Sequence, residues 1–166
     1  SIWYQKHMSH HILDGDDISW SQNMINCFLI RKPEDMLFSY QKRREKFTSD
    51  DFGLEKQLEI FQKILSNSGK TPPVVDIHKL LRDPEKYLKK LCELIEIPFS
   101  NKMLKWKAGS RESDGLWGQH WYKNVIKTTG FITKNSVKSD YNFTQEMKDI
   151  LEIIQPAYRK LAEYSI

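Results

Sequence analysis

Short apolar runs alternate with amphipathic stretches along this chain. Residues 23–30 are apolar almost throughout, which is typical of a strand buried on both faces of a parallel sheet. Residues 2–8 mix aromatic and branched side chains with polar ones and predict an earlier strand, and residues 72–77 predict a later one. The sequence thus predicts about three strands, fewer than most sheets contain, so the sheet would be incomplete.

Helical patterns separate these strands. Pro33 suits the first turn of a helix, where acidic residues follow it and lie near the positive end of the helix dipole. Leucine and phenylalanine recur at helical spacing over residues 51–67, and Ser68-Gly-Lys closes that helix. Asp83 followed by proline predicts the start of a third helix, which runs to about residue 95.

A terminal helix is predicted over residues 144–164, where apolar side chains again follow the helical period. Pro156 lies inside this helix and is expected to kink or split it. Residues 101–106 predict a further short helix. Strands that alternate with helices indicate an α/β fold with a mostly parallel sheet, and we expect a single domain over residues 1–166.

The composition is that of a globular protein. Hydrophobic residues make up 39% and charged residues 29% of the 166, which excludes collagen and low-complexity disorder. The net charge of +4 is spread along the chain, which permits an anionic ligand but does not demand nucleic acid, and we expect no nucleic-acid partner. We find no membrane-length apolar run and no leader, and therefore expect a cytoplasmic chain without membrane contact. Cys27 and Cys92 lie in apolar runs and predict buried free thiols.

The strongest candidate for a ligand site follows the apolar run that ends at Ile30. Arg31 comes directly after that strand, and Ser39 lies eight residues later, in the following helix. Ligands of open α/β sheets bind at the carboxyl ends of strands, where a guanidinium suits a phosphate and a hydroxyl adds a donor. The alternative is structural, with Arg31 paired to Glu34 or Asp35 and Ser39 exposed on a helix.

Residues 27–40 resemble the 3′-phosphate-binding segment of sulfotransferases, in which an apolar strand leads into Arg-Asn-Pro-x-Asp-x-x-x-Ser-Tyr. The resemblance implies that Arg31 and Ser39 bind the 3′-phosphate of the donor 3′-phosphoadenosine-5′-phosphosulfate. Lys32 stands where that family commonly has asparagine. The resemblance also implies a three-layer fold like that of the P-loop NTPases, with a parallel sheet flanked by helices.

Later segments extend the resemblance. Residues 74–99 are similar to the family's strand, Asp-Pro helix and Leu-Cys-x-x-Leu-Gly-Ile-Pro-Phe exit, and residues 103–122 resemble a Gly-rich loop of a sulfotransferase-like branch. That loop is comparable with the family's late loop over the 3′-phosphate. The resemblance implies that Arg111 binds the donor there, and that Gly115 and Trp117 shape the loop around it.

The opening segment is similar to the acceptor-side strand of the family, which carries a catalytic histidine after Lys-Thr. The resemblance implies that Lys6 stabilises the transferring group and that His7 accepts the proton of the acceptor. The register is one residue short of Lys-x-His, so His10 and His11 are further candidates. These histidines lack the helical spacing of a metal site, and we expect no metal.

One family element has no match in these residues, namely the N-terminal loop that binds the 5′-phosphosulfate. We therefore expect the C-terminal part of a sulfotransferase-like domain, with the start at Ser1 a truncation or split. A missing N-terminal segment or a second copy would complete the fold. This stretch alone is expected to be inactive.

In the complete protein we expect an enzyme that transfers a sulfuryl group from the nucleotide donor to a hydroxyl or amine of a small molecule or glycan. Two alternatives stay open at this point. One is a nucleotide- or anion-binding module without catalysis, and the other is a kinase-like transferase on the same scaffold. The residues that precede Ser1 would distinguish them.

Overall fold

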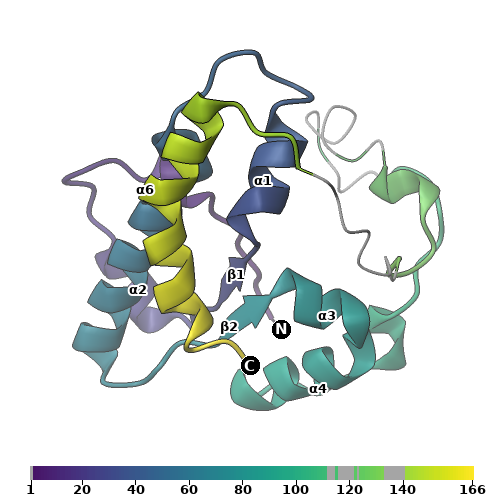
Figure 1. Cartoon of the computed structure of the whole chain (residues 1–166). Coiled ribbons are helices and arrows are strands. Elements are labelled where there is room, and N and C mark those ends of the chain that lie inside the picture. Colours follow the sequence, from purple (N-terminus) through teal and green to yellow (C-terminus); the bar gives the residue numbers. More distant parts are fainter. Residues whose placement is uncertain (1, 112–114, 116–121, 123, 133–140) are drawn as a thin grey trace. The chain divides into compact units, whose positions relative to one another are not determined.

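Two short parallel strands, β1 (Phe28–Ile30) and β2 (Val74–Asp76), lie at the centre of one compact unit of the chain (Figure 1). The computed structural model describes residues 2–111, 115, 122, 124–132 and 141–166. These residues form two compact units, one made of Ser1–Ile77 with Lys138–Ile166 and the other of His78–Val137. The described elements confirm the predicted α/β fold with a parallel sheet.

The register of the sheet places Ile30 opposite Asp76, so the carboxyl ends of both strands meet at one edge. Val74 also forms a parallel bridge with Ser165, which brings the C-terminus alongside β2. The strand expected over residues 23–30 is shorter than predicted, and one face of it is open. Leu29 is 58% exposed, whereas Phe28 and Ile30 are buried.

The strand predicted over residues 2–8 is not formed. Among the described residues no strand pairs with this segment, and Trp3 is 86% exposed. The backbone is extended at Met8, but an extended segment without a hydrogen-bonded neighbour is not a strand. The prediction of buried thiols is wrong for Cys27, which is exposed, and is confirmed for Cys92, which is buried.

Helix α1 (Pro33–Tyr40) begins with proline at its first turn, as the sequence indicates. Helix α2 (Leu54–Ser68) lies between two glycines in the left-handed conformation, Gly53 and Gly69, which only glycine adopts without strain. The predicted start at residue 51 was too early, since Ser49–Phe52 forms a separate 3-10 turn. That turn ends at Gly53, where the positive φ interrupts the helical path.

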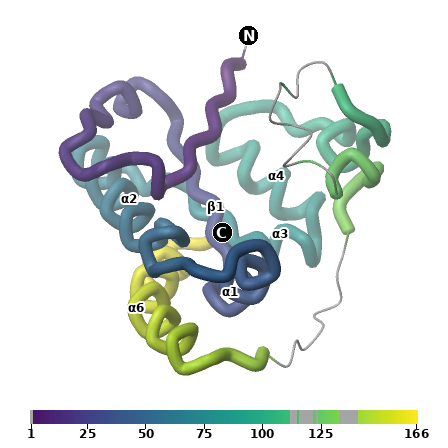
Figure 2. Tube along the Cα trace, turned by 90° about the horizontal axis from the view of Figure 1, so that it is seen from above, coloured from purple at the N-terminus to yellow at the C-terminus, as the bar shows by residue number. Residues whose placement is uncertain are grey.

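Helix α6 (Gln145–Ala162) packs against α1, α2 and both strands (Figures 1 and 2). Thr144 caps it by accepting a hydrogen bond from the backbone N–H of Met147 at 3.3 Å. Pro156 does not split this helix, which continues to Ala162. Ile154 and Ala157, on either side of the proline, are both buried, so tertiary packing holds the helix together where one backbone hydrogen bond is lost.

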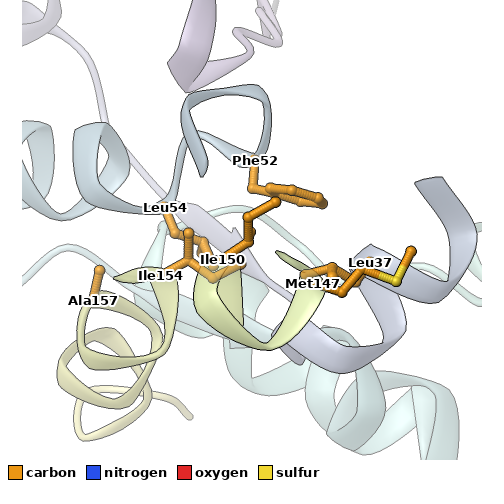
Figure 3. Close-up of a cluster of buried hydrophobic side chains, with 7 residues drawn as sticks. All are labelled: Leu37, Phe52, Leu54, Met147, Ile150, Ile154 and Ala157. Atoms are coloured by element: carbon orange, nitrogen blue, oxygen red, sulfur yellow. The ribbon is translucent and has the colours of Figure 1, made fainter. Parts of the chain in front are cut away.

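Two apolar clusters form the core of this unit. Figure 3 shows the first, in which side chains of α6 meet those of α1, α2 and the turn before α2: Leu37, Phe52, Leu54, Met147, Ile150, Ile154 and Ala157. The second lies between the inner face of the strands and the same two long helices: Phe28, Ile30, Phe61, Ile64, Val74 and Leu161. These clusters hold β1 and α1, which carry the candidate ligand site.

The second unit contains most of α3 (Ile77–Arg82) and all of α4 (Pro84–Leu94). The N-cap predicted at Asp83 is confirmed, since its carboxylate accepts from the backbone N–H of Lys86 at 3.1 Å. The sequence did not predict α3, which follows β2 without a glycine or proline to mark the change. Of the short helix expected over residues 101–106, only the 3-10 turn Asn101–Met103 forms. Within the described part of the chain, no helix has the length and apolarity to cross a membrane.

Candidate functional site

Arg31 occupies the carboxyl end of β1, between the strand and α1. The strand beneath it is anchored by buried Ile30, while Arg31 itself is exposed. Asp76 ends the neighbouring strand, directly opposite Ile30. The site predicted from sequence therefore lies at the edge of the sheet where parallel α/β proteins bind ligands.

The carboxylates around this edge bind partners other than Arg31. Each accepts a hydrogen bond from the C-terminal segment: Glu34 from Gln155 (3.1 Å), Asp35 from Tyr141, and Asp76 from Tyr158 (3.2 Å). Among the described residues, Arg31 has no hydrogen bond or ion pair. The alternative in which Arg31 pairs with Glu34 or Asp35 is thus not observed, and the guanidinium is available to an anion.

Asp76 is a buried carboxylate at this edge that sequence reasoning missed. It is a carboxylate only 7% exposed, and its hydrogen bond comes from the Tyr158 hydroxyl. Burial, and then the neighbouring Asp76 charge, raise the pKa of Tyr158 well above that of an ordinary tyrosine, so Tyr158 stays protonated as the donor. The signal in the sequence was a single charge that closes the apolar run Val-Val-Asp.

Ser39 lies near the end of α1 and is partly buried. It comes six residues after Pro33, ~9 Å along the helix axis. No hydrogen bond joins Ser39 to Arg31 among the described residues. A phosphate held by both would require the long Arg31 side chain to extend along α1.

Lys6 and His7 lie in the exposed segment that precedes the first 3-10 turn. The His7 Nε2 atom lies 3.1 Å from the Gln5 side-chain oxygen. The ring centroid of His7 lies 4.7 Å from that of Trp20. In the described part of the chain, no hydrogen bond, ion pair or ring contact links Lys6 or His7 to Arg31. The structure therefore does not bring these sequence-predicted groups together.

His10 is held more firmly than His7. It belongs to the 3-10 turn Ser9–His11, which is bound to the start of α2 by a hydrogen bond from Ser9 Oγ to the Gly53 carbonyl at 2.8 Å. Burial, followed by the adjacent His11, lowers the pKa of His10. His10 is therefore mostly neutral at pH 7, the state required of a proton acceptor.

Replacing Gly53 with alanine is expected to lower the free energy of unfolding by about 2–3 kcal/mol, because a left-handed residue gains a side chain in a filled space. An added Cβ would lie 2.6 Å from Ser9 Oγ and 2.9 Å from the backbone nitrogen of His10. Urea denaturation measures the loss. Freed from Gly53, His10 should also show a pKa closer to its ordinary value in an NMR titration.

Gly69→Ala is the matched control for this substitution. Gly69 has φ +65, close to the +60 of Gly53, but a Cβ there meets no atom within 4 Å. It should cost only the backbone strain of a left-handed residue, about 1 kcal/mol. Equal losses for the two variants, with His10 unchanged, would show that the Ser9–His11 turn does not depend on Gly53.

Arg111 and Gly115 lie in the second unit. Gly115 has a positive φ of 66, so this position does use the conformational freedom that the sequence suggested. Arg111 is exposed and takes part in an interaction of its own. Trp117 lies outside the described residues. No cluster of three His, Cys, Asp or Glu side chains suited to a metal occurs among the residues described.

Comparison with known proteins gives one family match. A family model for the sulfotransferase domain matches residues 1–163. Two proteins of Arabidopsis thaliana are similar over nearly the whole chain. Branched-chain-amino-acid aminotransferase-like protein 1 is 36% identical over 161 residues, which cover 97% of this chain and 28% of that protein. Branched-chain-amino-acid aminotransferase-like protein 2 is 35% identical over 156 residues, 94% of this chain and 27% of its own length. No solved structure matches.

Proposed function

We propose a function on the premise that this chain belongs to the sulfotransferase family, whose domain model matches residues 1–163. Residues 1–166 would then be the C-terminal part of a three-layer domain with the P-loop fold. The parallel pairing of β1 with β2 and the open face at Leu29 support further elements in the complete domain. The chain spans 28% and 27% of the two relatives compared, so the activity proposed is that of a complete protein.

The donor in this proposal is 3′-phosphoadenosine-5′-phosphosulfate, and the chain binds its 3′-phosphate. Arg31 supplies a bidentate guanidinium and Ser39 a hydroxyl. The family resemblance alone adds Arg111 and Gly115 as donor-binding residues. One observation carries this assignment. Arg31 lies at the carboxyl end of a parallel strand, and the carboxylates near it accept hydrogen bonds from other residues.

The reaction proposed is transfer of the sulfuryl group to a hydroxyl or amine of an acceptor. The acceptor oxygen or nitrogen forms a bond to sulfur as the bond from sulfur to the phosphate oxygen breaks. Lys6 stabilises the charge that builds on the transferring group, and His7, or else His10 or His11 a few residues later, accepts the acceptor's proton. The phosphate of adenosine 3′,5′-bisphosphate departs with the electron pair, so no redox step is needed.

Isothermal titration of the complete polypeptide with adenosine 3′,5′-bisphosphate and with AMP tests the donor assignment. AMP lacks the 3′-phosphate, so it should bind at least about tenfold more weakly, the value of one charge-assisted contact. Residues 1–166 alone should bind the bisphosphate more weakly than the complete protein does. Equal affinity for the two nucleotides would contradict a 3′-phosphate site at Arg31.

A further inference from the structure

An open cleft of about 950 Å³ lies wholly within the second unit of the chain. Within the described part of the chain, three segments line it: residues 82–85 at the junction of α3 and α4 (Figure 2), residues 104–106, and residues 127–132. The last two are joined by an antiparallel bridge between Lys105 and Gly130. Its volume is within the range of small-molecule sites in proteins.

Among the described residues, the two acidic side chains that line this cleft already have partners. The Asp83 carboxylate caps α4 by accepting from the backbone N–H of Lys86 at 3.1 Å. Glu85 Oε1 lies 2.6 Å from the ammonium of Lys89, one helical turn further along. Glu85 is therefore paired with a cation outside the cleft lining, whereas Asp83 keeps its charge and is held by the helix that it caps.

Of the described residues that line the cleft, three are cations, namely Arg82, Lys105 and Lys127. All three are exposed, and within the described part of the chain none of them makes a side-chain hydrogen bond or ion pair. Since Glu85 is offset by Lys89 and only the charge of Asp83 opposes the three cations, the described lining carries a net positive charge. Such a field favours an anionic ligand over a neutral one.

Aromatic rings form the apolar part of the lining. The ring centroids of Trp106 and Phe131 lie 5.4 Å apart in an edge-to-face arrangement. The Trp106 indole N–H donates to Thr128 Oγ1 at 3.1 Å, and that hydroxyl donates to the Val125 carbonyl at 2.7 Å. Since the polar atom of the indole is satisfied and its orientation fixed, its ring is left for apolar contact with a ligand.

We propose that this cleft is a second ligand site, which binds an anionic ester carried on a planar ring, with the cations holding the ester and Trp106 and Phe131 the ring. The inference goes beyond the proposed function, because none of Arg31, Ser39, Arg111 and Gly115 lines the cleft. Two sources share this chemistry, an aromatic sulfate or phosphate ester and an adenine nucleotide.

The test is a titration of the complete protein with para-nitrophenyl sulfate, para-nitrophenol and adenosine 3′,5′-bisphosphate. The sulfate ester should bind more tightly than the phenol. In the double variant Lys105→Gln/Lys127→Gln, the affinity for the sulfate ester should fall about tenfold, since two partly solvated cation contacts are lost. The phenol should bind as before. If the bisphosphate displaces the sulfate ester, the ligand of the cleft is an adenine nucleotide. If the bisphosphate binds beside the sulfate ester, the ligand is an aromatic ester.

A matched control is Lys90→Gln/Lys102→Gln, which removes two exposed charges of the same unit outside the cleft. It should leave the affinity for the sulfate ester unchanged. Arg31→Gln should also leave that affinity unchanged, so failure of the cleft proposal can be distinguished from failure of the 3′-phosphate proposal. Equal binding of the sulfate ester and the phenol, or equal losses in the cleft and control variants, would overturn the cleft proposal. Thermal unfolding of both double variants checks that the unit stays folded.

Discussion

Replacing Arg31 with glutamine is expected to weaken binding of adenosine 3′,5′-bisphosphate to the complete protein by about 10- to 100-fold, the effect of losing a charge-assisted contact to a phosphate. AMP, which has no 3′-phosphate, should lose much less. Arg31 has no protein partner among the described residues, so stability should change little and the effect should appear in binding. Isothermal titration with both nucleotides gives the comparison.

Arg159→Gln provides the control, because it removes the same charge from an exposed position on α6, in the same unit. It should leave both affinities within about twofold, as expected when only a distant, screened charge changes. If Arg31→Gln bound the bisphosphate as the unaltered protein does, or lost affinity for AMP equally, the guanidinium would not be the 3′-phosphate ligand.

Replacing Ile154 with alanine is expected to lower the free energy of unfolding by about 3 kcal/mol, because a fully buried side chain is lost and leaves a cavity. Ile154 is 0% exposed, and its side chain lies among Leu54, Ile150 and the rest of the cluster in Figure 3. The same cluster supports α1, which carries Ser39. Urea denaturation followed by circular dichroism measures the change.

The neighbouring residue Ile153 is the control for the same chemical change. It is 49% exposed on the same helix, so Ile153→Ala should cost less than about 1 kcal/mol, since little apolar surface is lost and alanine favours a helix. Equal losses at the two positions would mean that α6 does not use the face that contains Ile154 to hold the unit together.

The sequence predicted well those features that neighbouring residues determine. Pro33 at a helix start, Asp83 as a cap and Gly69 after α2 each act within one turn of chain, and each is found where predicted. The parallel sheet also followed from the pattern, because apolar runs separated by helices have few other arrangements. The family resemblance could also be recognised from the sequence, since Arg31, Pro33 and Ser39 belong to one short segment.

The features that the sequence did not predict depend on distant partners. Residues 2–8 have strand-like composition, yet no described strand lies beside them. Pro156 was expected to kink or split α6, and contacts with residues far along the chain keep the helix unsplit. At the candidate site, the sequence did not reveal the buried Asp76. The hydrogen bond that holds its carboxylate comes from Tyr158, 82 positions further along the chain.

By itself, then, the sequence determined the α/β class, the helix boundaries marked by Pro33, Asp83 and Gly69, and the position of Arg31 at the end of a strand. Only the tertiary structure decided that the nearby carboxylates bond to the C-terminal segment and leave Arg31 available. The physical reason is the separation along the chain between the groups that interact. Capping and periodicity are set by groups a few residues apart, whereas the partner of a charged side chain depends on which distant segment the fold places beside it.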